Sequence, residues 1–166
     1  RAALSPEALR GGLLFYGRAR CSACHRGPLL TDQEFHNVGI PNLGPGFDAG
    51  PDLGRARVTG ADTDRYAFRT PSLRGVAHSP PYMHNGAFAT LREIVDFLDA
   101  GGGSVPNKSP LLKALGLSED EKNDLVAFLE SLSMERPLIV EAPVLPPTLP
   151  LDGGGELCEQ PVQGRI

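Results

Sequence analysis

Apolar residues recur at helical spacing in three stretches of the chain, and the first stretch follows a helix-initiating sequence. Ser5-Pro6-Glu7 supplies a capping side chain, a proline suited to the first turn and a carboxylate for the positive end of the helix dipole. Apolar side chains then share one face as the pattern continues toward Arg20: Leu9, Leu13 and Tyr16. These positions predict a helix that begins at Ser5 and leads into a pair of cysteines.

Two further stretches predict helices in the second half of the chain. The first begins at Thr90 and ends at Gly101-Gly102-Gly103, and its apolar positions are Leu91, Ile94, Val95 and Leu98. Ser118-Glu119-Asp120-Glu121 is a capping box that opens the last helix, whose apolar stripe consists of Leu125, Val126, Leu129 and Leu132. Between these two helices, Ser109-Pro110 predicts a short helical turn that runs through Leu111, Leu112 and Leu115.

The remaining segments lack helical or alternating periodicity. Glycine and proline interrupt residues 26–89 so closely that we expect mostly irregular structure there, and a loop of this length in a compact domain usually wraps something. From Pro137 onward, repeated prolines and Gly153-Gly154-Gly155 predict an extended tail that still carries apolar residues. We therefore expect one domain over residues 1–135 and a Pro/Gly-rich tail over residues 136–166 that docks on a partner or on the domain itself.

Composition and charge narrow the class of protein. The chain has 166 residues, with 20 Gly and 16 Pro, yet 40% of its residues are hydrophobic, so it should fold around a small core with long loops. The formal net charge of -4 argues against a nucleic-acid binder that works through a basic surface. The sequence contains no run of about 18 apolar residues, so it predicts no membrane-spanning helix.

Cys21-Ser22-Ala23-Cys24-His25 carries the clearest chemical signal. C-x-x-C-H is the attachment site of a c-type haem, in which both thiols add to the haem vinyl groups and the histidine supplies the proximal nitrogen to iron. A thioredoxin-like C-x-x-C would call for a strand just before the motif, whereas a helix precedes this one. A structural zinc site would need two more ligands, for which only Cys158, His36, His78 and His84 remain. We expect one covalent haem c on Cys21, Cys24 and His25.

A covalent haem accounts for the sparse core, because the macrocycle supplies apolar surface that the short helices lack. The expected fold is therefore mainly α: a c-type cytochrome domain of short helices and long Gly/Pro loops around a covalent haem, with an extended C-terminal tail.

The loops contain a specific set of motifs between about residues 5 and 134. These are Phe35-His36-Asn37-Val38-Gly39, Asp52-Leu53-Gly54-Arg55, Val58-Thr59-Gly60, Phe68-Arg69-Thr70-Pro71-Ser72-Leu73-Arg74, Pro80-Pro81-Tyr82-Met83-His84-Asn85-Gly86, Phe88-Ala89-Thr90-Leu91 and Lys108-Ser109-Pro110-Leu111. The set resembles the C-terminal haem domain of the bacterial di-haem cytochrome c peroxidases and the related MauG proteins. The motifs of the second, N-terminal haem domain of that family do not occur in this sequence.

The resemblance implies three functional hypotheses. In the family, the C-terminal haem stores or relays an electron for the haem of the N-terminal domain, where peroxide is handled. We therefore first expect an electron-transfer domain or subunit that serves a redox partner protein or a larger redox complex. The alternative is a peroxide-dependent oxidoreductase whose N-terminal haem domain is missing from this chain. A third hypothesis is a five-coordinate haem protein that binds a diatomic gas.

The sixth iron ligand separates these hypotheses. The resembling proteins use a Met or a Tyr in the helix after the P-Y-x-H-x-G motif, and the matching position here is Leu98, which cannot coordinate iron. Either the iron is five-coordinate or another residue replaces the usual ligand, and Met83 is the best substitute. Met134 follows the last predicted helix and is expected to pack against the protein.

Other residues have weaker chemical signals. Arg69 and Arg74 could pair with the haem propionates, because guanidinium groups bind carboxylates bidentately; otherwise they are ordinary surface charges. Three histidines are expected to hydrogen-bond within loops, although one of them, His84, could act as a general acid–base if it pointed inward. Four acidic loop residues are expected to be solvated: Asp48, Asp52, Asp62 and Asp64. Two loop tyrosines, Tyr66 and Tyr82, are expected either to relay electrons or radicals or simply to pack in the loops.

The resemblance also bears on calcium and on location. The family binds a calcium ion between its two domains, partly through backbone carbonyls that match Ser79 and Pro81, and another ligand would come from the missing domain. This chain is therefore expected to supply only part of a calcium site. Cys158 in the tail could be free or could bridge to another chain. Because haem is attached covalently outside the bacterial cytoplasm, we expect the periplasm or the outer face of the cytoplasmic membrane.

Overall fold

A computed structural model describes residues 4–46, 50 and 52–133 of the chain. The elements in chain order are α1 (Pro6–Tyr16), the 3₁₀ helix η1 (Cys21–Ala23), β1 (Phe35–His36), α2 (Ala56–Thr59), the 3₁₀ helix η2 (Asp62–Asp64), β2 (Phe68–Arg69), the 3₁₀ helix η3 (Val76–His78), α3 (Leu91–Asp99) and α4 (Glu119–Ser131). The expected mainly helical fold with long loops is confirmed.

The three long helices begin where the capping residues predicted. The Ser5 hydroxyl accepts a hydrogen bond from the Ala8 amide, at 3.2 Å, at the start of α1. Thr90 and Ser118 each form a capping box, with Glu93 and Glu121 respectively, because both the hydroxyl and the glutamate oxygen take backbone N–H groups that the helix leaves unpaired. Such caps stabilise a helix by about 1 kcal/mol each.

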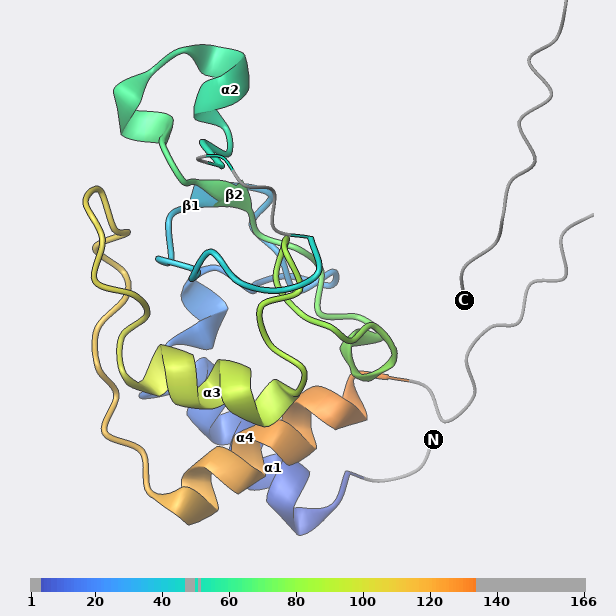
Figure 1. Cartoon of the computed structure of the whole chain (residues 1–166). Coiled ribbons are helices and arrows are strands. Elements are labelled where there is room, and N and C mark those ends of the chain that lie inside the picture. Colours follow the sequence, from blue (N-terminus) through green and yellow to red (C-terminus); the bar gives the residue numbers. More distant parts are fainter. Residues whose placement is uncertain (1–3, 47–49, 51, 134–166) are drawn as a thin grey trace, which may run out of the picture.

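α1 and α4 pack against each other at the base of the domain, and α3 lies beside α4 (Figure 1). Phe15, which is 1% exposed, contacts Phe128 with 5.0 Å between ring centroids. At the rim of the same contact, Arg10 donates two hydrogen bonds to the carboxylate of Asp124, Nε to Oδ2 at 2.7 Å and Nη2 to Oδ1 at 2.8 Å. The helices are thus joined by an aromatic core and a bidentate ion pair.

The face of α1 that packs is not the one predicted from Leu9, Leu13 and Tyr16. Ala8, Gly11 and Phe15 are buried, whereas Leu13 is 77% exposed. Leu9 and Tyr16, which share a face with Leu13, are also exposed. The reason lies at Gly11, where the absence of a side chain lets the backbone of α4 approach closely, so this face turns toward the core.

The predicted helical turn over residues 109–115 is also wrong. The structure has only a turn at positions 110–111. Leu112 donates to the Ser109 carbonyl at 3.2 Å within this turn, but Ser109 donates to the Asn37 carbonyl at 2.8 Å and Leu115 donates to the Asp99 carbonyl at 2.9 Å. Tertiary hydrogen bonds at both ends of the segment thus hold it in a non-helical path.

The loops lie over α3 and the two helices at the base, together with a short antiparallel ladder of β1 and β2 (Figure 1). In this ladder Phe35 pairs with Arg69 and His36 pairs with Phe68. α3 ends at Asp99, and Gly101 follows with a φ of 89°, a left-handed conformation that favours glycine.

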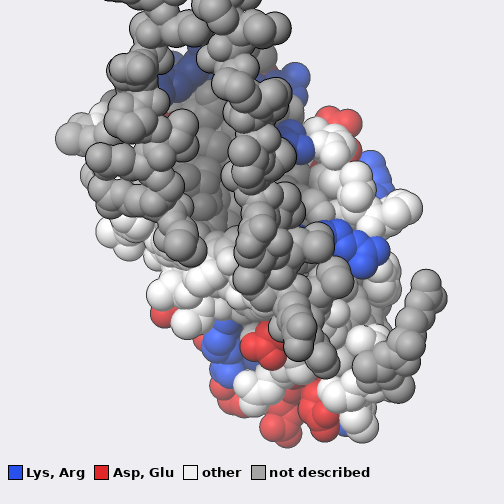
Figure 2. All heavy atoms as spheres, turned by 90° about the vertical axis from the view of Figure 1, so that its right-hand side faces the viewer, with Lys and Arg blue, Asp and Glu red and all other residues white. Residues whose placement is uncertain are grey.

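The tail predicted over residues 136–166, with its lone Cys158, and Met134 lie outside the described residues. Among the residues that are described, no helix has the length and apolar character needed to cross a membrane. Figure 2 shows acidic side chains gathered at the lower end of one face, the end formed by α1 and α4, with basic side chains between them and elsewhere on that face.

Candidate functional site

The C-x-x-C-H motif lies directly after α1, in a tight backbone turn. Arg20 takes a left-handed conformation with a φ of 56°, which turns the chain out of α1 and into η1. The amides of Ala23 and His25 then donate to the carbonyls of Arg20 and Cys21, both at 2.9 Å. These local hydrogen bonds hold the two cysteines and the histidine on one short turn.

Both motif cysteines are half-buried thiols that form no disulfide. Burial raises the pKa of Cys21 to about 11. Burial and the nearby charge of Asp32 raise the pKa of Cys24, against the opposing charge of Arg26. The two groups are therefore protonated thiols at neutral pH, and both are available for a covalent bond.

His25 is oriented by a hydrogen bond typical of a metal-binding imidazole. Its Nδ1 lies 2.9 Å from the carbonyl oxygen of Leu30, a residue that is 3% exposed. A carbonyl can only accept, so this contact assigns the ring proton to Nδ1 and leaves the lone pair on Nε2. Burial lowers the pKa of His25, which favours the neutral ring that a metal needs. The residues present therefore fit a haem held through two thioethers and one imidazole.

A second cluster adjoins the motif. Ligand atoms of Cys24, Asp32 and His36 all lie within 4.8 Å of one another. His36 Nε2 is 2.9 Å from Asp32 Oδ2, and the Glu34 amide donates to Asp32 Oδ1 at 2.9 Å. His36 therefore forms a hydrogen bond as expected, but it lies in β1 rather than in a loop. Asp32 was missed, because an Asp four residues before a His has no geometric meaning in a segment without helical periodicity.

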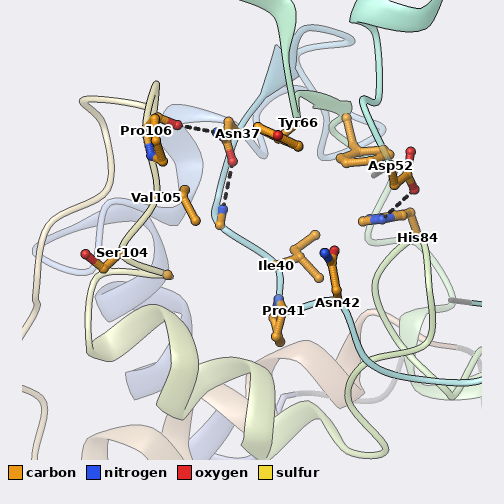
Figure 3. A pocket seen from close by; sticks show the side chains of 13 residues that line it. Asn37, Ile40, Pro41, Asn42, Asp52, Tyr66, His84, Ser104, Val105 and Pro106 are labelled. Atoms are coloured by element: carbon orange, nitrogen blue, oxygen red, sulfur yellow. Dashed lines mark hydrogen bonds and ion pairs between the residues drawn. The ribbon is translucent and has the colours of Figure 1, made fainter. Parts of the chain in front are cut away.

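His84 lies at a cavity of about 400 Å³ that is separate from this cluster (Figure 3). Its ring stacks on Phe68, with centroids 3.5 Å apart and planes 10° apart, and its Nε2 is 3.2 Å from Asp52 Oδ2. Burial lowers the pKa of His84, and the carboxylate of Asp52 opposes this. Asp52 was expected to be solvated, but it is half-buried and paired with His84.

The cavity is bounded mainly by loop residues, and Figure 3 shows several of them around its opening. Asn37 is buried and fixed on the wall: its Nδ2 donates to the Pro106 carbonyl at 3.0 Å and its Oδ1 accepts from the Gly39 amide at 3.0 Å. Tyr66 and Asn42 add further polar groups to the lining of the cavity. Within the described part of the chain, neither Met83 nor Leu98 is among the residues that line it.

The short ladder joins the cavity to the motif. His36, which contacts Asp32 beside Cys24, pairs across the ladder with Phe68, which stacks on His84. The two strands thus connect the segment beside the C-x-x-C-H motif to the segment that lines the cavity, although these segments lie far apart in the sequence.

The other predicted site residues are two arginines, Arg69 and Arg74, and the two residues considered at the sixth iron position, Met83 and Leu98. Arg69 is exposed and its Nη1 donates to Gln33 Oε1 at 2.5 Å, while Arg74 is exposed and its Nε donates to the Pro28 carbonyl at 2.9 Å. Met83 is half-buried with a φ of 69°, and Leu98 is half-buried near the end of α3. The described structure leaves their roles toward a haem as predictions.

Two further loop features bear on the sequence predictions. Tyr82 is buried in the core, as expected for a packed loop tyrosine, and Tyr66 is half-buried with a φ of 62°. The segment from Ser79 to Pro81 is exposed, and a calcium ion there stays a prediction.

Comparison with known proteins agrees with this geometry. The family described as cytochrome c matches residues 9–133. The chain is 46% identical to cytochrome-c peroxidase IdrP1 of Denitromonas iodatirespirans, over 88% of this chain and 45% of that protein. It is 41% identical to the methylamine utilization protein MauG of Methylorubrum extorquens, over 87% of this chain and 39% of that protein. The chain thus spans less than half the length of these relatives.

Solved structures show the same relationship. A crystal structure of a MauG-like protein associated with microbial copper homeostasis is similar, with a TM-score of 0.69 and 36% identity over 81% of this chain and 45% of that one. The di-haem peroxidase BthA of Burkholderia thailandensis is similar with a TM-score of 0.65 and 28% identity, over 80% of this chain and 44% of that one. The resemblance to the di-haem peroxidase and MauG proteins is confirmed. The chain belongs to the cytochrome c family, in a branch related to these proteins, and its cofactor is a covalently bound haem c.

Proposed function

We propose that the chain is an electron-transfer domain that holds one haem c through thioethers at Cys21 and Cys24 and an iron bond from His25. The observation that carries this proposal is the 2.9 Å contact between His25 Nδ1 and the Leu30 carbonyl. His25 is the residue that directly follows the second thiol of the motif. The contact leaves an imidazole lone pair for iron beside two thiols that form no disulfide, which is the set of groups that attaches a c-type haem.

Each residue of the motif has a distinct task. η1 and the residue that caps it, Cys24, present the two thiols at fixed spacing, and the Leu30 carbonyl holds the His25 ring at the tautomer that leaves Nε2 for iron. The same hydrogen bond increases the basicity of the ring and so strengthens it as a ligand. The haem supplies one-electron exchange when bound. The protein's contribution is to keep this group in place and limit its access to water.

Leucine at position 98 gives iron no sixth ligand, so electron transfer through a six-coordinate haem needs a ligand from elsewhere in the chain, and leucine does not supply the group that peroxide chemistry needs either. Peroxide reduction needs a group that moves a proton near the reacting oxygen, and a leucine side chain offers none. We propose Met83 as the sixth ligand, since thioether sulfur is a common partner of histidine in electron-carrying haems. With two protein ligands the iron would have no open face.

The wider setting is also a proposal. Because the chain spans less than half of its curated relatives, we infer that it works with a second haem domain or with a separate redox partner protein. Arg69 and Arg74 are proposed as propionate partners, since both are exposed and both hydrogen-bond to the segment after the motif, at Gln33 and Pro28. Because haem c is attached outside the bacterial cytoplasm, we propose the periplasm as the location.

A second candidate function is peroxide-dependent oxidation, which the relatives' names favour together with one observation in this chain. His84 and Asp52 form a paired acid–base group on the wall of a cavity that is large enough for small molecules. Such a pair can hold and return a proton. In this case the domain would work with a second haem domain, and the His84–Asp52 pair would move a proton.

The optical and EPR spectra of the ferric holoprotein, recorded with and without peroxide, test both functions. The electron-transfer proposal expects low-spin iron that peroxide does not alter. High-spin iron that changes on peroxide addition would contradict it and support the second candidate. In that case His84→Gln should slow the peroxide reaction at least tenfold, while His78→Gln, a change at an exposed histidine, should leave the rate unaltered.

A further inference from the structure

Asp32 is an acidic side chain buried beside a cysteine of the motif. Its side chain is 3% exposed, and its carboxylate oxygen lies within 4.8 Å of both Cys24 Sγ and a ring nitrogen of His36. A carboxylate that is this buried and lies outside the ion pairs of the helices calls for a specific explanation.

Hydrogen bonds stabilise the ionised form of this carboxylate. Burial alone would raise the pKa of Asp32, but donors from His36, the Glu34 amide and Thr70 outweigh burial and hold the pKa at about 2. Asp32 therefore carries its charge throughout the physiological pH range.

The field of this charge reaches the residues that hold the cofactor. The negative charge of Asp32 raises the pKa of Cys24 and also opposes the lowering of the His25 pKa. Arg26 is the cation that acts in the opposite direction at Cys24. A fixed charge in a buried site is little screened by solvent or salt, so its effect on a nearby redox centre is larger than that of a surface charge.

A metal-binding role for the same three side chains is less consistent with the structure. Cys24 is committed to a thioether under the proposed function, and Asp32 and His36 already satisfy each other. Two hydrogen-bonded side chains next to an alkylated sulfur make a poor metal site. The constant feature of the cluster in the haem-bearing protein is its negative charge.

We propose that Asp32 lowers the reduction potential of the haem attached at Cys24. Ferric iron carries one more positive charge than ferrous iron, so a buried anion close to the haem edge stabilises the oxidised state. This inference rests on the proposed function, because it requires the haem at Cys24. Asp32 acts through the electric field of its charge at the haem, and is thus a tuning residue rather than a catalytic one.

The test is the midpoint potential of the full-length holoprotein, measured by spectroelectrochemistry at low and high salt. Asp32→Asn keeps the shape and can still accept from the Glu34 amide, and it should raise the potential at both salt concentrations. Asp32→Glu keeps the charge and should stay close to the wild type. Asp62→Asn is the matched control, because the Asp62 side chain is 86% exposed, and it should leave the potential unchanged.

A second variant separates charge from loosening of the loop. His36→Leu removes a donor from Asp32 but retains the carboxylate, so the anion is less compensated and the potential should fall. If His36→Leu and Asp32→Asn both raised the potential, the charge of Asp32 would not be the cause and the inference would be wrong. An unchanged potential in Asp32→Asn with haem bound would also overturn it.

Intact mass under denaturing conditions distinguishes this failure from failure of the proposed function. A wild-type protein without covalent haem overturns both. A wild-type protein with covalent haem whose potential is insensitive to Asp32 overturns only the role of Asp32. A fall in the unfolding midpoint of Asp32→Asn without a change of potential would assign Asp32 a purely structural role, which also contradicts the inference.

Discussion

Gly11 of α1 lies directly against the backbone of Asp124 in α4. A Cβ atom built at position 11 would stand 1.9 Å from the Asp124 carbonyl oxygen and 2.8 Å from Cβ of Phe128. No side chain can be accommodated at this distance without moving one helix. The crossing of α1 and α4, and with it the start of the haem-binding turn, therefore depends on a hydrogen atom at this position.

Gly11→Ala should destabilise the protein by about 2–3 kcal/mol, because the two helices must separate to admit the methyl group. The free energy of unfolding from denaturant titration of the holoprotein measures this. Gly12→Ala is the matched control: its nearest neighbours are ring atoms of Phe128 at 3.3 Å, and the gain in helix propensity of up to about 1 kcal/mol offsets a small shift of the ring. Equal effects of the two substitutions would contradict the close approach at Gly11.

Asp32 should make stability depend on pH in the acid range. Its pKa of about 2 in the folded protein is below the ordinary value of 3.8, so it stabilises the fold above pH 3.8 and this contribution is lost as the pH falls toward 2. The contribution is of the order of 2 kcal/mol. The difference in unfolding free energy between the wild type and Asp32→Asn should therefore shrink between pH 5 and pH 2, in steps that denaturant titrations at fixed ionic strength can follow. A difference that stays constant over this range would show that Asp32 is not stabilised in its ionised form.

The three cysteines should differ in their effect on the haem. Cys24→Ala should leave haem attached through Cys21 alone, and the double change at both positions should abolish covalent attachment, because the Cys21–His25 motif has no other thiol. Cys158→Ser should leave the mass of the haem–protein adduct otherwise unaltered. Intact mass and the visible spectrum of the reduced protein measure this, since a vinyl group left free extends the conjugation of the macrocycle. Covalent haem in the double variant would contradict the assignment of these thiols.

Met83→Leu tests the sixth ligand. Leucine resembles methionine in volume and experiences the same left-handed backbone with a φ of 69°, so the change removes the sulfur with little other effect. The ferric iron should change from low spin to high spin and should then bind added cyanide or nitric oxide faster. Met134→Leu serves as the control and should not alter the spectrum. An unchanged spin state in Met83→Leu would exclude Met83 as a ligand.

Some features of this protein follow from sequence alone because they are local. Cys21, Cys24 and His25 fall within five consecutive positions, so a single turn brings them together whatever the rest of the chain does. Ser5, Thr90 and Ser118 cap helices through bonds to residues three positions away, which the sequence order also contains. The loop motifs also allowed the family to be predicted from the sequence, because their residues and spacing are specific even where the structure is irregular.

The tertiary structure decided the contacts that join distant segments. Glycine and proline break the periodicity of residues 26–89, so the sequence carries no signal that His84 pairs with Asp52 or that Asp32 lies beside Cys24. The buried face of α1 likewise depends on Gly11 and on how closely α4 can approach, whereas residue hydrophobicity pointed to Leu13. Helix caps and the haem motif are set by neighbours along the chain, but burial and long-range hydrogen bonds depend on which surfaces can come into contact, and only the packed chain determines that.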